Sequence, residues 1–282
     1  MTVTKPLSIK GSVVAITGGA RGIGLAIAKA FLFEGARVAI GDIDGELVET
    51  VAEDIGAFGG RLDVRDRASF SDFIQRAEQA LGPVDIMINN AGIMPMGSFL
   101  SEAAELSDTQ IDINLRGVIH GMRATMPGML ARKRGHIINI ASLAGRFAIP
   151  GAAVYSATKF AVVGLTETVA AENRDTGLNF SVIMPAIVST ELASGSENAR
   201  GGLPQITPEV VAASVVKCVK KPRIHIAVPE FMETAHSLYG LLPAWVKDKG
   251  RRLMGDDRIL TKMDAKAHSG YAERIASLTT RK

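Results

Sequence analysis

The sequence predicts an α/β fold, a doubly wound three-layer sandwich around a central parallel sheet of about seven strands. Seven short apolar runs rich in β-branched residues are spread along the chain, which is typical of buried parallel strands. Stretches of about 10 to 30 residues separate these runs, and several have helical periodicity. Because crossovers between parallel strands are right-handed, this alternation places helices on both faces of one sheet. The expected strands are residues 13–17, 37–42, 60–64, 84–90, 136–142, 180–186 and 224–229.

The segments between the strands follow the same plan. The first helix carries an apolar stripe that runs from Ile23 to Phe31, directly after the first strand. Residues 189–206 are small, polar and rich in glycine, which indicates a mobile loop. We expect residues 1–229 to form one domain and residues 230–282 to form a helical extension packed on or near a substrate pocket.

The composition excludes several classes of protein. The chain has 282 residues, of which 47% are hydrophobic and 22% charged, so it is neither disordered nor collagen-like. A formal net charge of +3 is no footprint for nucleic acid. The single Cys218 allows no intrachain disulfide, and the five histidines lack a metal-binding spacing. These cysteine and histidine positions lead us to expect no metal site. Because neither a signal peptide nor a run of about 18 apolar residues is present, we expect a cytoplasmic protein.

The end of the first strand carries the first candidate site. Residues 17–24 read TGGARGIG and lead directly into a helix. Glycines let the chain turn sharply and let backbone N–H groups approach a pyrophosphate, and the helix N-terminus adds a partial positive charge. The expected members of this dinucleotide cradle are Gly18, Arg21, Gly22, Ile23 and Gly24.

Acidic residues near two further strand ends predict how the adenosine is bound. Asp42 ends the second strand, where a carboxylate accepts hydrogen bonds from the ribose hydroxyls and repels a 2′-phosphate. NAD is therefore favoured over NADP, although the cation of Arg21 softens that preference. Asp44 is a better candidate than Asp42 for capping the next helix. Asp63, closing the third strand, is expected to reach the adenine amino group, with Val64 packing against the ring.

Several polar residues complete the pattern and carry a resemblance. Tyr155 and Lys159 lie four residues apart in YSATK, so a helix presents both on one face. Ser142 ends a strand thirteen residues before Tyr155. From about residue 8 to residue 229, the chain closely resembles the short-chain dehydrogenase/reductase family. The matching pieces are TGGARGIG at 17–24, Asp63, NNAG at 89–92, Asn114, Ser142, YSATK at 155–159, and Pro185 with Thr190.

The resemblance implies a Rossmann-like catalytic domain over residues 1–229 and hydride transfer between an alcohol and a carbonyl. It implies that Tyr155 is the general acid/base and that Ser142 holds the substrate oxygen. Lys159 would hydrogen-bond the nicotinamide ribose and, with the positively charged nicotinamide ring, bring the pKa of Tyr155 nearer to neutral. Asn114 would organise a water through which the proton reaches solvent.

The resemblance also implies contacts along the rest of the cofactor. Besides the tyrosine and lysine above, it assigns cofactor contacts to Asn90, Ala91, Gly92, Pro185, Val188 and Thr190. Asn89 is either part of this group or a strand-end hydrogen bonder that stabilises the sheet. Ala186 stands where the family usually has glycine. This departure puts the local freedom of the backbone in question, but not the fold.

Almost all residues expected near the substrate are apolar. They are Ile93, Met94, Met96, Leu143, Ala144, Phe147, Ile149, Ile187 and Leu192. Arg146 is the one cation nearby, and we expect it to face solvent. We therefore expect a lipophilic alcohol or ketone, such as a steroid, a retinoid-like compound or a fatty compound. The alternative is that these side chains belong to the core.

The tail after residue 229 leaves more than one interpretation open. The apolar stretch 238–246 is followed by the basic run 247–252, a combination typical of a segment that lies on a membrane surface. A flap over the pocket, an oligomer contact and a helix packed on the protein's own core are the alternatives. Pro243 and Gly250 interrupt any single amphipathic helix here.

The function expected from the sequence is an NAD(H)-dependent dehydrogenase acting on a small-molecule alcohol or ketone, as a homodimer or homotetramer. One alternative is a catalytically silent dinucleotide-binding sensor or scaffold. Such a protein has no chemical need for Asn114, Ser142, Tyr155 and Lys159 together, so the presence of all four favours the enzyme. Another is a sugar-nucleotide epimerase, for which the tail of about fifty residues is too short to supply a second domain.

Overall fold

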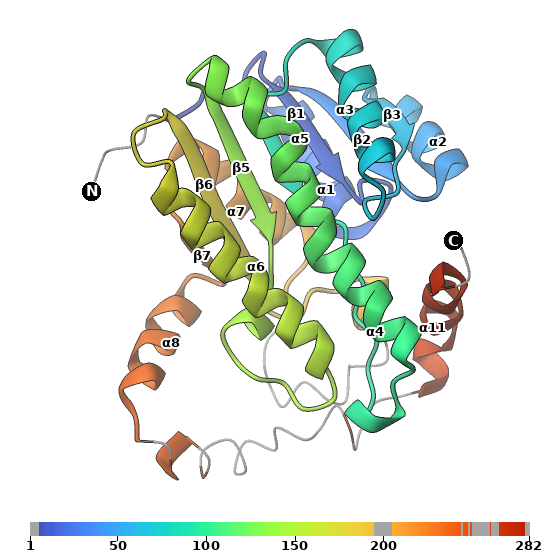
Figure 1. Ribbon diagram of the computed structural model, residues 1–282, viewed down its shortest axis with the longest axis vertical. Helices are drawn as coiled ribbons and strands as arrows, with labels where there is room; N and C mark the ends of the chain where they lie inside the picture. The colour runs from blue at the N-terminus through green and yellow to red at the C-terminus, as the bar shows by residue number, and fades with distance from the viewer. Residues whose placement is uncertain are drawn as a thin grey trace.

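A single parallel sheet organises the molecule (Figure 1). The computed structural model describes residues 6–194, 205–243, 245–247, 249, 260 and 265–279. The strands are β1 (Val13–Thr17), β2 (Arg37–Asp42), β3 (Phe58–Arg61), β4 (Ile86–Asn89), β5 (Gly135–Ile140), β6 (Leu178–Pro185) and β7 (His225–Val228). They pair in the order β3-β2-β1-β4-β5-β6-β7, all parallel. The predicted doubly wound α/β fold is confirmed.

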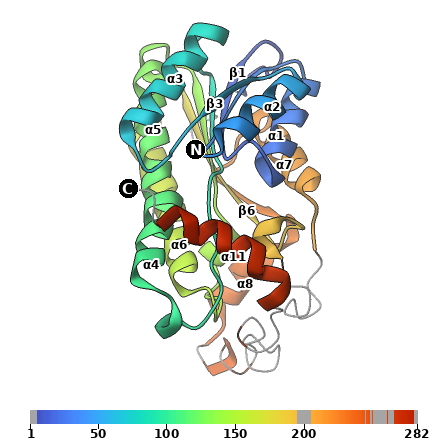
Figure 2. The same ribbon diagram turned by 90° about the vertical axis from the view of Figure 1, so that its right-hand side faces the viewer.

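Helices cover both faces of the sheet, as Figure 2 shows edge-on. The helices are α1 (Gly22–Phe33), α2 (Gly45–Ile55), α3 (Arg67–Leu81), α4 (Ala104–Ile111), α5 (Gly117–Ala131), α6 (Ala153–Glu172), α7 (Pro208–Lys220), α8 (Phe231–Leu241) and α11 (Ala265–Thr279). Short turns are η1 (Phe99–Ser101), the π-helical η2 (Asp112–Arg116), η3 (Leu143–Gly145) and η4 (Glu191–Ala193). Helices α1, α2 and α7 lie on one face, and α3, α5 and α6 lie on the other.

The period of two in the strands divides the hydrophobic core into two halves. In β1, Val14 and Ile16 pack into the half under α1 and α7, whereas Val13 and Ala15 pack into the half under α3 and α5. All five β1 residues are buried, because a strand covered on both faces has no solvent side. These two halves hold the strand ends, and with them the loops of the candidate site, in fixed positions.

The third strand differs from its predicted range of 60–64. Strand β3 pairs with β2 in a register that places Phe58 beside Ala39 and Arg61 beside Asp42. Since β2 ends at Asp42, the partner strand ends at Arg61. Asp63 therefore does not close the strand but follows it in a loop.

The order of the strands reverses between β1 and β4. The chain winds outward from β1 to β3 and then returns to the other side of β1, so connections on the two sides leave in opposite directions. Ligands of such sheets bind at this switch point, beyond the carboxyl ends of the strands. The loops after Thr17 and Asn89 meet there.

The tail contributes α8 and α11 within the described residues. Helix α11 packs against α4 and η4 and crosses the carboxyl end of the sheet (Figure 2). No described helix is long and apolar enough to span a membrane. Two segments that the sequence indicated are described only in part. Residues 195–204 of the glycine-rich loop lie outside the described residues, and so do Ala244, Asp248 and residues 250–252 of the tail.

Candidate functional site

Hydrogen bonds tie the glycine loop to the loop that follows β4. The Thr17 hydroxyl accepts the backbone N–H groups of Asn90 and Ala91, each at 3.0 Å. In return, the Asn90 amide donates to the carbonyls of Thr17 at 2.9 Å and Gly18 at 3.0 Å. Asn90 thus holds the glycine loop in shape with its amide N–H₂ group, a task that the sequence did not indicate.

The conformation of the loop requires glycine at the predicted places. Gly18 and Gly22 have φ of +65° and +55°, in the left-handed region where a side chain is strained. A Cβ on Gly24 would lie 2.1 Å from the Gly18 carbonyl oxygen. Helix α1 begins at Gly22, and Arg21 before it makes no side-chain capping bond. The N-terminus of α1 is therefore suited to an anion.

Asp42 and Arg21 lie beside this loop in different situations. The Asp42 carboxylate accepts the N–H groups of Ala20 at 3.2 Å and Asp44 at 3.3 Å. Arg21 pairs with Asp44 at 2.9 Å and approaches Glu191 at 3.8 Å. Asp44 also caps α2 by accepting the Leu47 N–H, as predicted. The guanidinium of Arg21 is thus engaged by acids.

Asp63 is held by a residue that the sequence did not single out. Arg65 binds both carboxylate oxygens, with its Nε 2.9 Å from Oδ1 and its terminal nitrogen 2.7 Å from Oδ2. Burial alone would raise the pKa of Asp63, but the hydrogen bonds and charge of Arg65 hold it below the ordinary value. The neighbouring Val64 is buried and packs against Gly117.

Asn114 links the β4 loop to helix α6. It lies in the π-helical turn η2, a feature often found at functional sites. Its Oδ1 accepts the Ile93 N–H at 2.8 Å, and its Nδ2 donates to the Ile93 carbonyl at 2.8 Å and to the Thr158 hydroxyl at 3.3 Å. A Cβ on Gly92 would lie 3.3 Å from this Oδ1 and 3.5 Å from Lys159 Nζ. Asn114 and Lys159 therefore face the same glycine.

Tyr155 and Lys159 lie on the buried side of α6. The Lys159 ammonium donates to the Ile140 carbonyl at 2.9 Å and lies 5.6 Å from the centre of the Tyr155 ring. Ser142 caps η3 by accepting the Ala144 N–H at 3.1 Å and hydrogen-bonds Tyr155. The i, i+4 spacing and the end of β5 bring these three side chains together, as the sequence predicts.

Burial shifts both titrating groups strongly. It raises the pKa of Tyr155 to about 12, although the hydrogen bond with Ser142 acts in the opposite direction. It lowers the pKa of Lys159 to about 8, since the charged ammonium loses its hydration. At neutral pH the phenol is therefore protonated and the ammonium charged, so the protein alone does not bring the pKa of Tyr155 toward neutral.

The same residues match a known family. The family model described as short chain dehydrogenase matches residues 12–201, more than half of the chain. The chain belongs to the short-chain dehydrogenase family. It is therefore an oxidoreductase of a fold that binds a nicotinamide cofactor, and the glycine loop with the uncapped start of α1 fits the phosphates of such a group.

Individual relatives agree with this assignment. The oxidoreductase UcpA of Escherichia coli strain K12 is 37% identical over 222 residues, which cover 77% of this chain and 83% of UcpA. The glycine betaine reductase ATRR of Emericella nidulans is 34% identical over 240 residues, 80% of this chain but only 19% of that protein. A short chain dehydrogenase/reductase from Burkholderia phymatum, solved in complex with NAD, has a TM-score of 0.76 at 26% identity, covering 83% of this chain and 94% of that one.

Three of the expected substrate residues of this short-chain dehydrogenase surround the tyrosine. Ala144 forms a small buried cluster with Ala152 and Tyr155, against which Met94 and Ile149 pack. Leu143 and Leu192 pack instead against the larger core half under α5 and α6, together with the buried Ile93. Half-buried positions are held by Met96, Phe147 and Ile187.

The cation near these residues is paired. Arg146 lies 3.1 Å from Glu167, and 24% of its side chain is exposed, so the expectation that it faces solvent is wrong. Its ion pair with α6 draws the guanidinium onto the protein. Asn89, whose role was open, is buried and donates to the Asn139 side chain at 2.8 Å, which makes it a hydrogen bonder within the sheet.

Helix α11 brings to the site residues that the sequence did not indicate. The Tyr271 hydroxyl, buried, accepts the Met94 N–H at 2.8 Å. His268 donates to the Ser194 carbonyl at 2.9 Å, and Arg274 pairs with Glu191. Arg65, while it holds Asp63, also donates to the Leu278 carbonyl at 2.8 Å. These contacts join residues up to 213 positions apart in the sequence, so no local sequence pattern predicts them.

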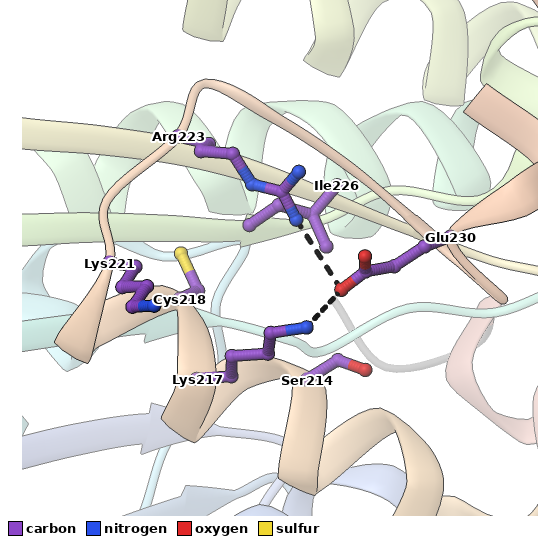
Figure 3. Close-up of a pocket in the computed structure, with 7 residues that line it drawn as sticks. All are labelled: Ser214, Lys217, Cys218, Lys221, Arg223, Ile226 and Glu230. Atoms are coloured by element: carbon purple, nitrogen blue, oxygen red, sulfur yellow. Dashed lines mark hydrogen bonds and ion pairs between the residues drawn. The ribbon is translucent and has the colours of Figure 1, made fainter. Parts of the chain in front are cut away.

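A separate cavity of about 270 Å³ lies elsewhere on this dehydrogenase (Figure 3). It opens between α7 and the edge strand β7, and Lys217 and Arg223 converge there on one oxygen of Glu230, at 2.6 Å and 3.4 Å. No residue of the predicted catalytic group lines it. Among the residues described, no group of His, Cys, Asp and Glu side chains could hold a metal ion.

Proposed function

We propose that this short-chain dehydrogenase transfers hydride between NAD(H) and a lipophilic alcohol or ketone, with Tyr155 as general acid/base. The observation that carries the proposal is the arrangement around the phenol. Tyr155 is buried between Ser142, which hydrogen-bonds it, and Lys159, whose ammonium lies 5.6 Å from its ring. A proton donor, a second hydroxyl and a fixed positive charge then act on one substrate oxygen.

Each polar residue has a separate task in this proposal. In ketone reduction, Tyr155 gives its proton to the developing alkoxide while Ser142 donates a hydrogen bond to the same oxygen. Lys159 stabilises the phenolate that remains, because its ammonium is charged below a pKa of about 8. Asn114, fixed by three hydrogen bonds, orients a water on the path of the proton.

The direction of proton transfer follows from burial. A phenol with a pKa of about 12 is ready to act as an acid at neutral pH. Alcohol oxidation needs the phenolate, which Lys159 favours electrostatically. The nicotinamide, when bound, accepts or delivers the hydride and in its oxidised form adds a second positive charge.

The choice of NAD rests on Asp42. Its carboxylate stands at the end of β2 with both oxygens oriented by backbone N–H groups, in a position to accept the ribose hydroxyls. The cation best placed for a 2′-phosphate, Arg21, is neutralised by Asp44 and Glu191. The proposed cofactor contacts are Gly18, Arg21, Gly22, Ile23, Gly24, Asp42, Asp63, Val64, Asn90, Ala91, Gly92, Tyr155, Lys159, Pro185, Val188 and Thr190.

The lipophilic substrate is proposed from the side chains that surround Tyr155. Met94, Ala144 and Ile149 pack against its cluster, and the nearest cation, Arg146, is paired with Glu167. No charged partner for a carboxylate or phosphate is thus offered by these residues. Apolar contacts of this kind favour steroid-like, retinoid-like or fatty substrates over sugars and hydroxy acids.

The test combines cofactor binding with turnover. Wild-type protein should bind NADH, measured by fluorescence titration, and oxidise secondary lipophilic alcohols with NAD. Tyr155→Phe should bind NADH normally but lose about 10² to 10⁴-fold in turnover. Tyr239→Phe, which keeps its ring against Phe147, is the matched control and should stay active.

Three outcomes would overturn parts of this proposal. Near-normal turnover by Tyr155→Phe would remove the catalytic assignment. Exclusive turnover of small polar sugars or hydroxy acids would remove the lipophilic substrate. NADH binding by wild-type protein without turnover of any alcohol or ketone in a broad panel would favour the silent sensor or scaffold instead.

A further inference from the structure

Large apolar side chains are exposed along α8 and just beyond it. Phe231 is 61% exposed and Leu238 62%, and since they are two helical turns apart, they share one face of α8. After the helix ends, Leu242 and Trp245 are 42% and 69% exposed. Scattered surface leucines need no explanation, but four large apolar side chains within fifteen residues form a patch of the kind that marks an interaction site.

Another part of α8, next to Leu238 in the sequence, contacts the proposed substrate region. The Tyr239 ring packs edge-on against Phe147, with ring centres 5.6 Å apart. Phe147 belongs to the residues expected near the substrate. Figure 1 shows α8 at the end of the molecule to which the strand arrows point. Ser142, which follows β5, and Tyr155, in the first turn of α6, lie at the same end of the strands. The exposed apolar residues of α8 therefore lie at the same end of the molecule as Tyr155, on a helix that contacts Phe147.

Basic residues follow the patch directly. Lys247 lies over the Tyr239 ring at 5.4 Å, and Lys249 is exposed. In the sequence, residues 247–252 contain four basic residues and one acidic residue. Apolar side chains beside basic ones are the combination that binds the interface of an anionic bilayer, where the former enter the acyl boundary and the latter meet the head groups.

We propose that α8, together with Leu242, Trp245, Lys247 and Lys249, docks this protein on an anionic lipid surface, so that the end of the molecule that carries Tyr155 faces the bilayer. The proposal rests on the proposed lipophilic substrate for its purpose, because such a substrate dissolves in the membrane, but not for its geometry. A second copy of the chain is a poorer occupant. A two-fold interface here would set like-charged basic segments against each other.

The chain carries its own reporter for the test. Trp245 is the only tryptophan, so its emission reports on this segment alone. Mixing the full-length protein with vesicles of phosphatidylcholine and phosphatidylglycerol should shift that emission to the blue and cosediment the protein. Vesicles of phosphatidylcholine alone should do so more weakly, and added salt should reduce the binding, since exposed charges are screened.

Two variants and one control test the surface. Leu238→Asp should weaken vesicle binding about tenfold or more, because an exposed leucine would otherwise be buried in the interface. Lys249→Glu should weaken it on anionic vesicles in particular. Phe33→Asp alters an aromatic residue at the end of α1 that is even more exposed, at 92%, and should bind as wild type does. Turnover of a small water-soluble alcohol should be unchanged in all three.

The results separate this proposal from the proposed function. Absence of vesicle binding by the wild-type protein, or equal binding by Leu238→Asp, would overturn the docking surface. A dimer in sedimentation that Leu238→Asp dissociates, without vesicle binding, would overturn it in favour of a contact between copies. Vesicle binding together with failure to turn over lipophilic alcohols would leave the surface standing and remove the substrate assignment.

Discussion

Tyr155 and Lys159 are moved by burial in opposite directions. The phenol loses its tendency to ionise, with a pKa of about 12, and the ammonium loses part of its hydration, with a pKa of about 8. The two values leave a wide range of pH in which both groups are protonated. In that range the pair is set for carbonyl reduction rather than for alcohol oxidation.

The pH dependence of reduction should therefore follow Lys159. Below a pKa of about 8 the ammonium is charged and the rate should be level, whereas above it the charge is lost and kcat/KM for ketone reduction should fall. Lys159→Arg keeps its charge at all these values and should abolish the fall, whatever its absolute rate. A steady-state pH profile measures this, and an unchanged fall in the arginine variant would contradict it.

Asp42 carries a separate prediction about the cofactor. Asp42→Ala removes the carboxylate that we propose accepts the ribose hydroxyls and repels a 2′-phosphate, so the ratio of kcat/KM for NADP over NAD should rise about tenfold or more. Asp54→Ala removes an exposed acid from the neighbouring helix and should leave the ratio as it is. If both variants keep the wild-type ratio, Asp42 does not read the ribose.

At the scale of elements, η2 and α11 give the site its shape. The π-helical turn brings Asn114 against both backbone groups of Ile93, which ties α5 to the β4 loop. Helix α11 then reaches the same loop from the far end of the chain, through Tyr271 and Met94. The two elements therefore hold consecutive residues, Ile93 and Met94.

The contact made by α11 should be measurable as stability. Tyr271→Phe leaves the Met94 N–H without its partner, and the loss of that hydrogen bond should cost about 1–3 kcal/mol in the free energy of unfolding. Glu273→Gln changes an exposed position of the same helix and should cost almost nothing. Urea unfolding of both variants measures the difference. Equal unfolding midpoints for the two variants would show that the hydrogen bond between Tyr271 and Met94 does not stabilise the fold.

At the scale of the whole molecule, the sheet separates the two halves of the hydrophobic core, and a cluster of polar side chains is buried within the protein. His136 on β5 is fully buried, with its Nε2 2.9 Å from the Ser181 hydroxyl, and Cys218 on α7 lies 3.1 Å from the same hydroxyl. Burial lowers the pKa of His136 to about 3 and raises that of the Cys218 thiol. Both side chains are therefore uncharged at neutral pH and act as packing and hydrogen-bonding groups.

His136 makes the fold sensitive to acid. Its pKa is about 3 in the folded chain against 6.5 when unfolded, so below pH 6.5 the unfolded chain binds more protons and stability falls as the pH drops toward 3. His136→Gln cannot be protonated and should flatten this fall in Tm between pH 6.5 and 4, even if it lowers Tm at neutral pH. A fall in Tm over this range that is as steep in His136→Gln as in the wild type would contradict this prediction.

Most of the catalytic group was predictable because it depends on short spacings. Tyr155 and Lys159 are one helical turn apart, so a helix presents both on one face. Ser142 and Asn90 follow parallel strands, whose carboxyl ends meet at one edge of the sheet. The glycines at 18, 22 and 24 were predictable for the same reason, since the turn itself demands them. The end of β3 was misplaced, because pairing with β2 rather than the apolar pattern determines where that strand stops.

The sequence by itself determined the fold class through the period of its strands and helices, and the family through motifs that occur in the family's order. It also predicted the glycine loop from a short motif, and the catalytic group from the resemblance to that family. Only the tertiary structure decided that Arg65 holds Asp63, that Arg21 is engaged by Asp44 and Glu191, and that Tyr271 reaches Met94. Those contacts join segments that the order of the strands and the packing of α11 bring together. The period of a helix or strand is visible in consecutive residues, whereas the packing of distant elements produces no local sequence pattern.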